Sequence, residues 1–142
     1  MRRRNVIILG LSALSLAGLG RTVRGTLADA AAAVTAAEDW LALVDAGKTG
    51  ESWEEAAALF KRAMTKEQWQ AALSAVRAPL GKALSRKLTS KRAMTSLPGA
   101  PDGEYVVIQY TTSFENKKDA VETITPMRDP DGEWRVSGYF IR

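Results

Sequence analysis

The sequence contains neither cysteine nor histidine. The absence of cysteine excludes disulfide bonds, zinc–thiolate sites, cysteine nucleophiles and a lipid-modified N-terminal cysteine. The absence of histidine removes the most common general base and metal ligand in proteins. Any catalysis would therefore rest on Asp, Glu, Tyr, Lys or Ser, and we expect neither a metal ion nor another cofactor.

The excess of positive charge is confined to the N-terminus. The chain of 142 residues has 20 basic and 16 acidic residues, but residues 1–30 hold five of the arginines and only one of the acids. Residues 31–142 therefore have 15 basic and 15 acidic residues. A nucleic-acid-binding domain normally carries its positive charge on the folded domain itself, so we expect no nucleic-acid partner.

Residues 1–30 have the parts of an export signal. Three arginines at positions 2–4 precede the apolar run of residues 6–20, and residues 28–30 (Ala-Asp-Ala) match the pattern before a cleavage site. The apolar run is shorter than the ~20 residues that a membrane-spanning helix needs. We therefore predict a signal peptide over 1–30, one domain over 31–142, and a periplasmic or secreted protein. The alternative is an uncleaved signal anchor, through which alone the chain would contact a membrane.

Apolar residues recur at helical spacing through the first half of the domain. They predict a helix over residues 30–46, a second helix that begins with a capping box at Ser52–Glu55, and a third that begins with another capping signal at Thr65–Gln68. Pro79 and Gly81 end or kink the third helix. The four tryptophans lie on the apolar sides of these helices and of the last strand, so we interpret them as core residues.

The second half of the domain is rich in β-branched and aromatic residues. It predicts four strands, over residues 86–94, 104–114, 120–127 and 134–141. The short turn sequences between them favour an antiparallel meander. We therefore predict an α+β fold, with three N-terminal helices packed on one face of a four-stranded antiparallel sheet.

Alternation along these strands assigns each residue to one face of the sheet. The side facing the helices is predicted to hold Val106, Ile108, Tyr110, Thr112 and Phe114, with Trp134, Val136, Gly138 and Phe140 from the last strand. The opposite face is mixed in character and is the candidate ligand or partner face, with Tyr105, Gln109, Arg135 and Tyr139. Aromatic residues beside arginine are typical of interfaces. We expect this face to contact an envelope protein, a second copy of the chain, or a small apolar ligand.

A second candidate site is a basic run that contains no acid, formed by Arg86, Lys87, Lys91 and Arg92. It would suit contact with phosphate, anionic lipid or an acidic partner. The alternative is a sheet edge kept soluble by its charges. No aromatic residue interleaves with the run, so base stacking on nucleic acid has no support. The acidic segment Asp129–Glu133 has too few ligands for a calcium loop and predicts a hairpin turn.

Five stretches of the sequence carry a family pattern. They are AEDWLALVDAG (37–47), SWEEAAALFK (52–61), EQWQAALSAVRAPLGKALSRKL (67–88), SLPGAPDGEYVVIQYTTSF (96–114) and DGEWRVSGYFIR (131–142). These stretches resemble a bacterial family of small exported proteins known only as domain of unknown function 4019. The resemblance implies an exported single domain, and it carries no reaction, ligand or catalytic residue. The fold also resembles the nuclear-transport-factor-like and cystatin-like folds, which host enzymes, binding modules and dimerisation domains alike.

The favoured function is a non-catalytic binding or interaction module, and no residue is assigned a catalytic role. The alternative is a small-molecule enzyme with a carboxylate base in a cone-shaped pocket, where burial would raise the pKa of Glu122 towards the working pH. An enclosed apolar pocket around that carboxylate would favour the enzyme. A third candidate is a passive structural component of the envelope.

Overall fold

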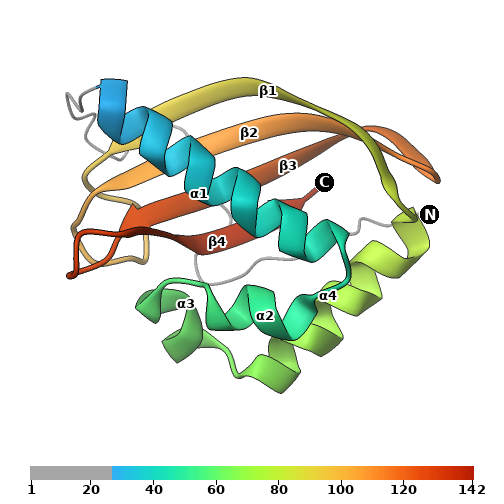
Figure 1. Ribbon diagram of the computed structural model, residues 1–142, viewed down its shortest axis with the longest axis horizontal. Coiled ribbons are helices and arrows are strands. Elements are labelled where there is room, and N and C mark those ends of the chain that lie inside the picture. The colour runs from blue at the N-terminus through green and yellow to red at the C-terminus, as the bar shows by residue number, and fades with distance from the viewer. Residues whose placement is uncertain (1–26) are drawn as a thin grey trace.

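The computed structural model describes residues 27–142 and places four helices before a four-stranded antiparallel sheet (Figure 1), which confirms the predicted α+β class. The sheet has the strand order β1-β2-β3-β4, so each strand pairs with the next along the chain and β1 and β4 form the edges. The elements are α1 (Leu27–Asp45), α2 (Thr49–Glu54), α3 (Ala58–Ala63), α4 (Lys66–Leu80), β1 (Ala83–Met94), β2 (Tyr105–Phe114), β3 (Lys117–Arg128) and β4 (Trp134–Ile141).

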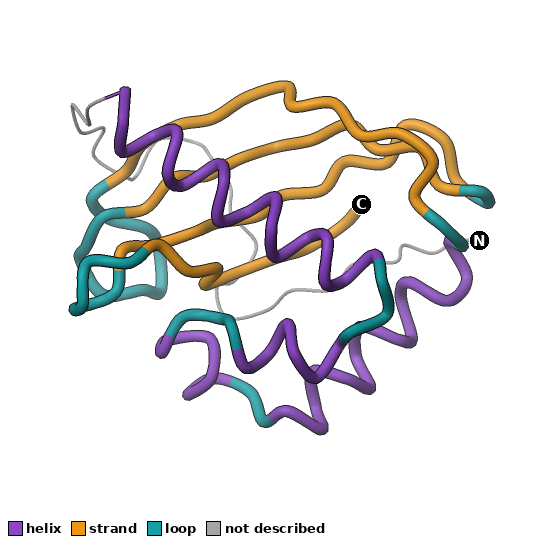
Figure 2. Tube along the Cα trace, in the orientation of Figure 1, coloured by secondary structure: helices purple, strands orange, loops and turns teal. Residues whose placement is uncertain are grey.

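The helices form two groups. Helix α1 crosses one face of the sheet, whereas α2, α3 and α4 lie together beyond the β4 edge (Figures 1 and 2). The prediction of three helices is wrong, because the predicted second helix is two short ones, α2 and α3. The α2–α3 connection also contacts the edge strand, where the Ala57 N–H donates to the Val136 carbonyl at 2.8 Å.

The predicted capping box at Ser52 is wrong, because Ser52 lies inside α2 and is fully buried. Its hydroxyl donates to the Thr49 carbonyl at 2.6 Å and accepts from the Trp69 indole at 2.8 Å, while its own carbonyl accepts from the Trp40 indole at 2.8 Å. The serine therefore satisfies two buried tryptophans rather than a helix end. The second predicted capping box is confirmed, because Thr65 and Gln68 exchange both hydrogen bonds at the start of α4.

The main core lies between α1, the sheet and the second helix group. Trp40 is at its centre, with ring centroids 5.2 Å from Tyr139, 5.7 Å from Trp69 and 6.3 Å from Phe60. Trp40 and Trp69 are buried, and the other two tryptophans are half-buried against the same core, as predicted. A smaller apolar cluster gathers Met94, Leu97, Tyr105 and Val107.

A β-bulge in β4 changes which residues reach the core. Thr125 pairs with Gly138 but the next residue, Pro126, pairs with Val136, so Ser137 is the extra residue. Proline has no N–H to give to the ladder, which makes this a natural place for a bulge. The Ser137 hydroxyl is buried and donates to the Thr125 carbonyl at 2.7 Å.

One extra residue reverses the alternation of every residue beyond it. Val136 therefore packs in the main core as predicted, but Tyr139 and Ile141 join it there in place of the predicted Gly138 and Phe140. The prediction that Gly138 and Phe140 face the main core is therefore wrong. On β2, which has no such irregularity within Val106–Tyr110, the predicted core side is confirmed.

Candidate functional site

The four residues of the predicted ligand or partner face do not form one surface. Tyr139 faces the helices and is 1% exposed. Tyr105 is also 1% exposed, because residues 95–104 fold against it, and its hydroxyl donates to the Pro101 carbonyl at 2.6 Å. Gln109 is half-buried on the sheet face away from α1. Arg135 is the second residue of β4, and its charge is paired with Asp129 and Asp131 of the β3–β4 turn.

The predicted basic run divides into two parts. Arg86 is half-buried and pairs with acids from α1 and β3. Lys87, Lys91 and Arg92 are exposed, and within residues 27–142 no ion pair engages them. Since β1 is an edge strand, these three residues are the charged surface that sequence analysis predicted, and Arg86 belongs to the interior.

Glu122 is the centre of a buried ionic network. Its carboxylate is 0% exposed and accepts three side-chain donors. The Arg86 Nε donates to Oε1 at 2.7 Å, the Thr112 hydroxyl donates to Oε1 at 2.5 Å, and the Tyr139 hydroxyl donates to Oε2. Both carboxylate oxygens are therefore occupied by partners from the other three strands of the sheet.

The network continues into the helices through Asp45. Arg86 Nη1 donates to Asp45 Oδ2 at 2.7 Å, and Arg77 Nη2 from α4 donates to Asp45 Oδ1 at 2.9 Å. Arg77 also stacks over the Phe114 ring at 4.9 Å. Two carboxylates thus meet two guanidiniums, so the network is neutral as a whole and ties α1 and α4 to all four strands.

The network fixes the protonation of Tyr139 and of Asp45. Burial and then the Glu122 carboxylate raise the pKa of the Tyr139 hydroxyl well above its usual range, so the phenol stays protonated and remains a donor. Burial alone would raise the pKa of Asp45, but the guanidiniums of Arg86 and Arg77 outweigh it and hold that pKa below its usual range. Asp45 therefore stays ionised at neutral pH.

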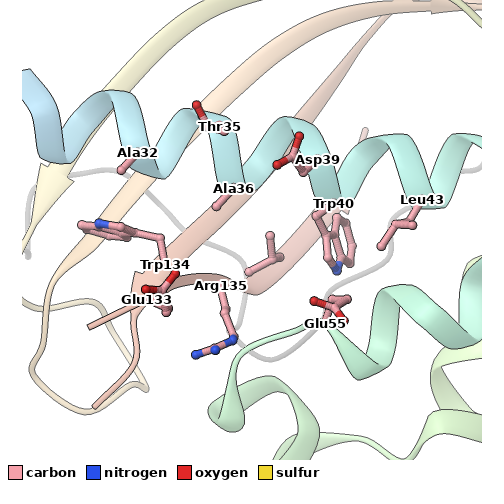
Figure 3. Close-up of a pocket in the computed structure, with 11 residues that line it drawn as sticks. Ala32, Thr35, Ala36, Asp39, Trp40, Leu43, Glu55, Glu133, Trp134 and Arg135 are labelled. Atoms are coloured by element: carbon pink, nitrogen blue, oxygen red, sulfur yellow. The ribbon is translucent and has the colours of Figure 1, made fainter. Parts of the chain in front are cut away.

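A groove of about 360 Å³ opens between α1 and β4 (Figure 3). Trp40 and Leu43 project from α1, Trp134 faces α1 from β4, and Glu55 approaches from the α2–α3 connection (Figure 3). We call this the α1–β4 groove, and it is lined by Ala32, Thr35, Ala36, Asp39, Trp40, Leu43, Glu55, Glu133, Trp134, Arg135 and Val136.

The charge of the groove is dominated by acids. Asp39, Glu55 and Glu133 are exposed, and within residues 27–142 no side-chain hydrogen bond or ion pair engages their carboxylates. Arg135 is the single cation among the described lining residues; it points away from α1 (Figure 3) and is paired with acids of the turn. Its Nη2 lies 2.9 Å from Asp131 Oδ2, and its Nη1 lies 3.1 Å from an oxygen of Asp129, the first residue of the turn.

The Arg135 pairing is also visible in the electrostatics of the turn. The hydrogen bond from Arg135 lowers the pKa of Asp131 to about 2, with help from the Glu133 backbone N–H. Arg135 is thus neutralised by its own turn, and the uncompensated charge facing the groove is negative. The predicted hairpin turn is confirmed, since the Gly132 N–H donates to the Asp129 carbonyl at 2.8 Å.

Sequence reasoning did not single out the groove acids. The sequence pattern places Glu55 in a capping box, and it gives Asp39 no role. A signal was nevertheless present, because an acid directly precedes a tryptophan in Asp39-Trp40 and again in Glu133-Trp134. The two pairs lie 94 positions apart in the printed sequence, so only the fold reveals that they line one groove.

Two other hollows differ from this groove. One lies at Thr95, Ser96, Asp102 and Gly103, and the other lies beside the ionic network, where Asp45 and Arg77 form part of its wall. Glu122 lines none of the three. Within residues 27–142 no group of three acids is placed to hold a metal ion.

No helix among the described residues is long and apolar enough to cross a membrane. The predicted signal peptide falls on residues 1–30, of which residues 1–26 lie outside the described part of the chain. The predicted cleavage point after Ala30 falls in the first turns of α1.

Helices followed by a four-stranded antiparallel meander, with an ionic network around a buried glutamate and an acidic groove, define the class of this domain as α+β. A family model described as "Protein of unknown function (DUF4019)" matches residues 36–139, and the chain belongs to this family. The match confirms the resemblance seen in the five sequence stretches. Neither a curated protein nor a solved structure matches the chain, so the likeness to the nuclear-transport-factor-like and cystatin-like folds stays a prediction.

Proposed function

We propose that the protein is an exported, non-catalytic binding module whose α1–β4 groove takes a small molecule with a cationic group on an apolar body. The observation that carries the proposal is the pairing of aromatic walls with three exposed carboxylates that no cation within residues 27–142 neutralises. Ligand pockets are typically lined by apolar and aromatic side chains, with a few polar groups that set orientation. Here those polar groups are acids, which select for a cation.

The walls of the groove are held in place before any ligand arrives. The Trp40 indole is fixed by its hydrogen bond to Ser52 and by three ring contacts in the core. The Trp134 ring is held from one side by the Arg128 guanidinium at 5.1 Å. A pre-formed wall favours binding, because little side-chain ordering is needed on association.

The state of Glu122 supports a binding function over the alternative enzyme. A general base needs a lone pair within hydrogen-bond reach of a substrate. Both oxygens of Glu122 accept protein donors, and the carboxylate lines none of the three hollows. The proposal of export rests on the sequence of residues 1–30. We expect a periplasmic or secreted protein, and N-terminal sequencing of the purified protein should begin at Ala31.

Calorimetric titration of the purified protein with 2-phenylethylamine tests the proposal, with 2-phenylethanol as the neutral probe of similar shape. We expect the amine to bind more tightly, and its affinity to fall with added salt because the attraction is between exposed charges. The variant Asp39→Asn/Glu55→Gln/Glu133→Gln should lose most of the difference between the two probes. The matched control is Glu67→Gln, an exposed acid on α4 outside the groove.

Equal affinity for the amine and the alcohol would contradict the cationic preference. Unchanged amine binding in the triple variant would contradict the placement of the site. A Trp134→Ala variant measures the contribution of the apolar wall to affinity, because it should weaken the binding of both probes to the same extent.

A further inference from the structure

The outer edge of β1 is open. Within residues 27–142 this strand pairs only with β2, and no other element lies beside its outer edge (Figure 1). A strand edge presents backbone N–H and C=O groups that can pair with another chain. The β4 edge differs, because the α2–α3 connection covers it and Ala57 already donates to the Val136 carbonyl.

The open edge carries positive charge on both faces of the sheet. Arg92 pairs with Val107, so it lies on the sheet face away from α1. Lys91 pairs with Ile108, so it lies on the face that carries the main core. Lys87 shares the side of Arg92. All three cations are exposed without an ion pair in the described chain, and β1 contains no acid.

These charges discriminate between the strands that could be added. A second copy of β1 in an antiparallel pair centred on Lys91 would set this lysine opposite its own copy, and a pair centred on Arg92 would do the same for the arginine. Like charges directly opposite destabilise a strand pair. A strand with carboxylates on both faces would instead meet a cation on each face. The same charges that prevent self-pairing therefore favour an acidic partner.

We propose that the β1 edge binds an extended acidic peptide segment of another protein, which adds to the sheet as a fifth strand. Main-chain hydrogen bonds give affinity in this mode of recognition, and side chains give specificity. Register shifts at Leu84 and Thr89 limit regular pairing to two stretches, residues 85–88 and 90–94. The second stretch holds Lys91 and Arg92, and Leu84, which is 66% exposed, offers an apolar contact before the first.

Fluorescence anisotropy with a labelled peptide of Glu and Val, about eight residues long to match an ordinary strand, tests the proposal. We expect binding that weakens with salt and falls by about tenfold or more in Lys91→Glu/Arg92→Glu, because two attractive contacts become repulsive. The matched control is Lys117→Glu/Lys118→Glu, which reverses the charge of two exposed lysines at the start of β3. This variant should bind the peptide as the unchanged protein does. Thermal unfolding of both variants confirms that each remains folded.

Two further measurements separate strand addition from charge attraction alone. A peptide of the same sequence, N-methylated at alternate amides, should bind much more weakly because it cannot complete the ladder. Hydrogen exchange should show new protection of amides within residues 85–94 when the unmodified peptide is bound. Equal binding by the N-methylated peptide, protection elsewhere, or binding only to anionic vesicles would overturn the proposal. Self-association of the protein through β1 in sedimentation experiments would also overturn it.

Discussion

Two sets of carboxylates in this molecule have opposite surroundings. Glu122 and Asp45 belong to a network in which every carboxylate meets a guanidinium. The acids of the α1–β4 groove are exposed and have no cationic partner in the described chain. Burial explains why Glu122 is paired, because an unpaired charge in the interior costs several kcal/mol whereas water stabilises one at the surface. The network therefore concerns folding, and the groove is where charge remains available for a ligand.

The largest expected effect comes from removing the cation of the network. Arg86→Met leaves the buried Glu122 without its counter-charge, and breaking a buried pair in this way typically costs about 3–5 kcal/mol of unfolding free energy. Urea denaturation measures this loss. The matched control is Arg92→Met, the same change at an exposed position of the same strand, which should shift stability by no more than about 0.5 kcal/mol.

A double variant shows whether the loss arises from charge or from packing. Arg86→Met/Glu122→Met replaces the pair with apolar groups, and such replacements are often close to neutral. The double variant should therefore be more stable than Arg86→Met alone. Equal losses in Arg86→Met and Arg92→Met would show that the network contributes nothing to folding.

The next effect distinguishes the two tyrosines that alternation placed on one face. Tyr139→Phe removes a buried hydrogen bond to a carboxylate, for which a loss of about 1.5–3 kcal/mol is typical. Tyr105→Phe removes a bond to the Pro101 carbonyl and should cost about 0.5–1.5 kcal/mol. Urea denaturation of the two variants checks this order. If Tyr139→Phe left the free energy of unfolding unchanged, Tyr139 would belong to the exposed face that the sequence predicted.

The case of Tyr139 shows where sequence reasoning succeeds and where it stops. The four strands, their antiparallel order and the core side of β2 follow from β-branched residues, turns and alternation, which act over neighbouring positions. The side of Tyr139 depends on the bulge at Ser137, which belongs to the pairing of two strands. Pro126 and Gly138 are residue types that often mark β-bulges. The sequence therefore indicated that a bulge could occur here, but not which residue would be the extra one.

The site depends even more on distant contacts. Arg86 lies in a basic run that looked like surface, and its partners Asp45 and Glu122 are 41 and 36 residues away. No local pattern specifies such a pairing. The groove likewise brings α1 together with residues at the β3–β4 turn. Ser52 fits a capping pattern in the sequence, but in the fold it accepts hydrogen bonds from two tryptophans instead.

A smaller effect appears in acid. The pKa of Asp45 lies below its usual value of 3.8 in the folded protein, so this group contributes stability that is present above pH 3.8 and is lost as the pH falls through its lowered pKa. The unfolding free energy should therefore fall with decreasing pH in this window. In Asp45→Asn the fall should be shallower, as urea denaturation at a series of pH values would show. Parallel curves for the two proteins would mean that the ion pairs of Asp45 do not form in solution.

The smallest effect on stability is expected at the groove, and this completes the comparison. Neutralising its acids in Asp39→Asn, Glu55→Gln and Glu133→Gln removes no hydrogen bond or ion pair within the described chain, so each change should shift stability by about 0.5 kcal/mol or less. The triple variant should nevertheless lose its preference for an amine. A loss above about 1 kcal/mol for any single change would instead assign that acid to the folded structure. An unchanged free energy of unfolding together with a loss of amine binding would show that these side chains serve a ligand rather than the fold.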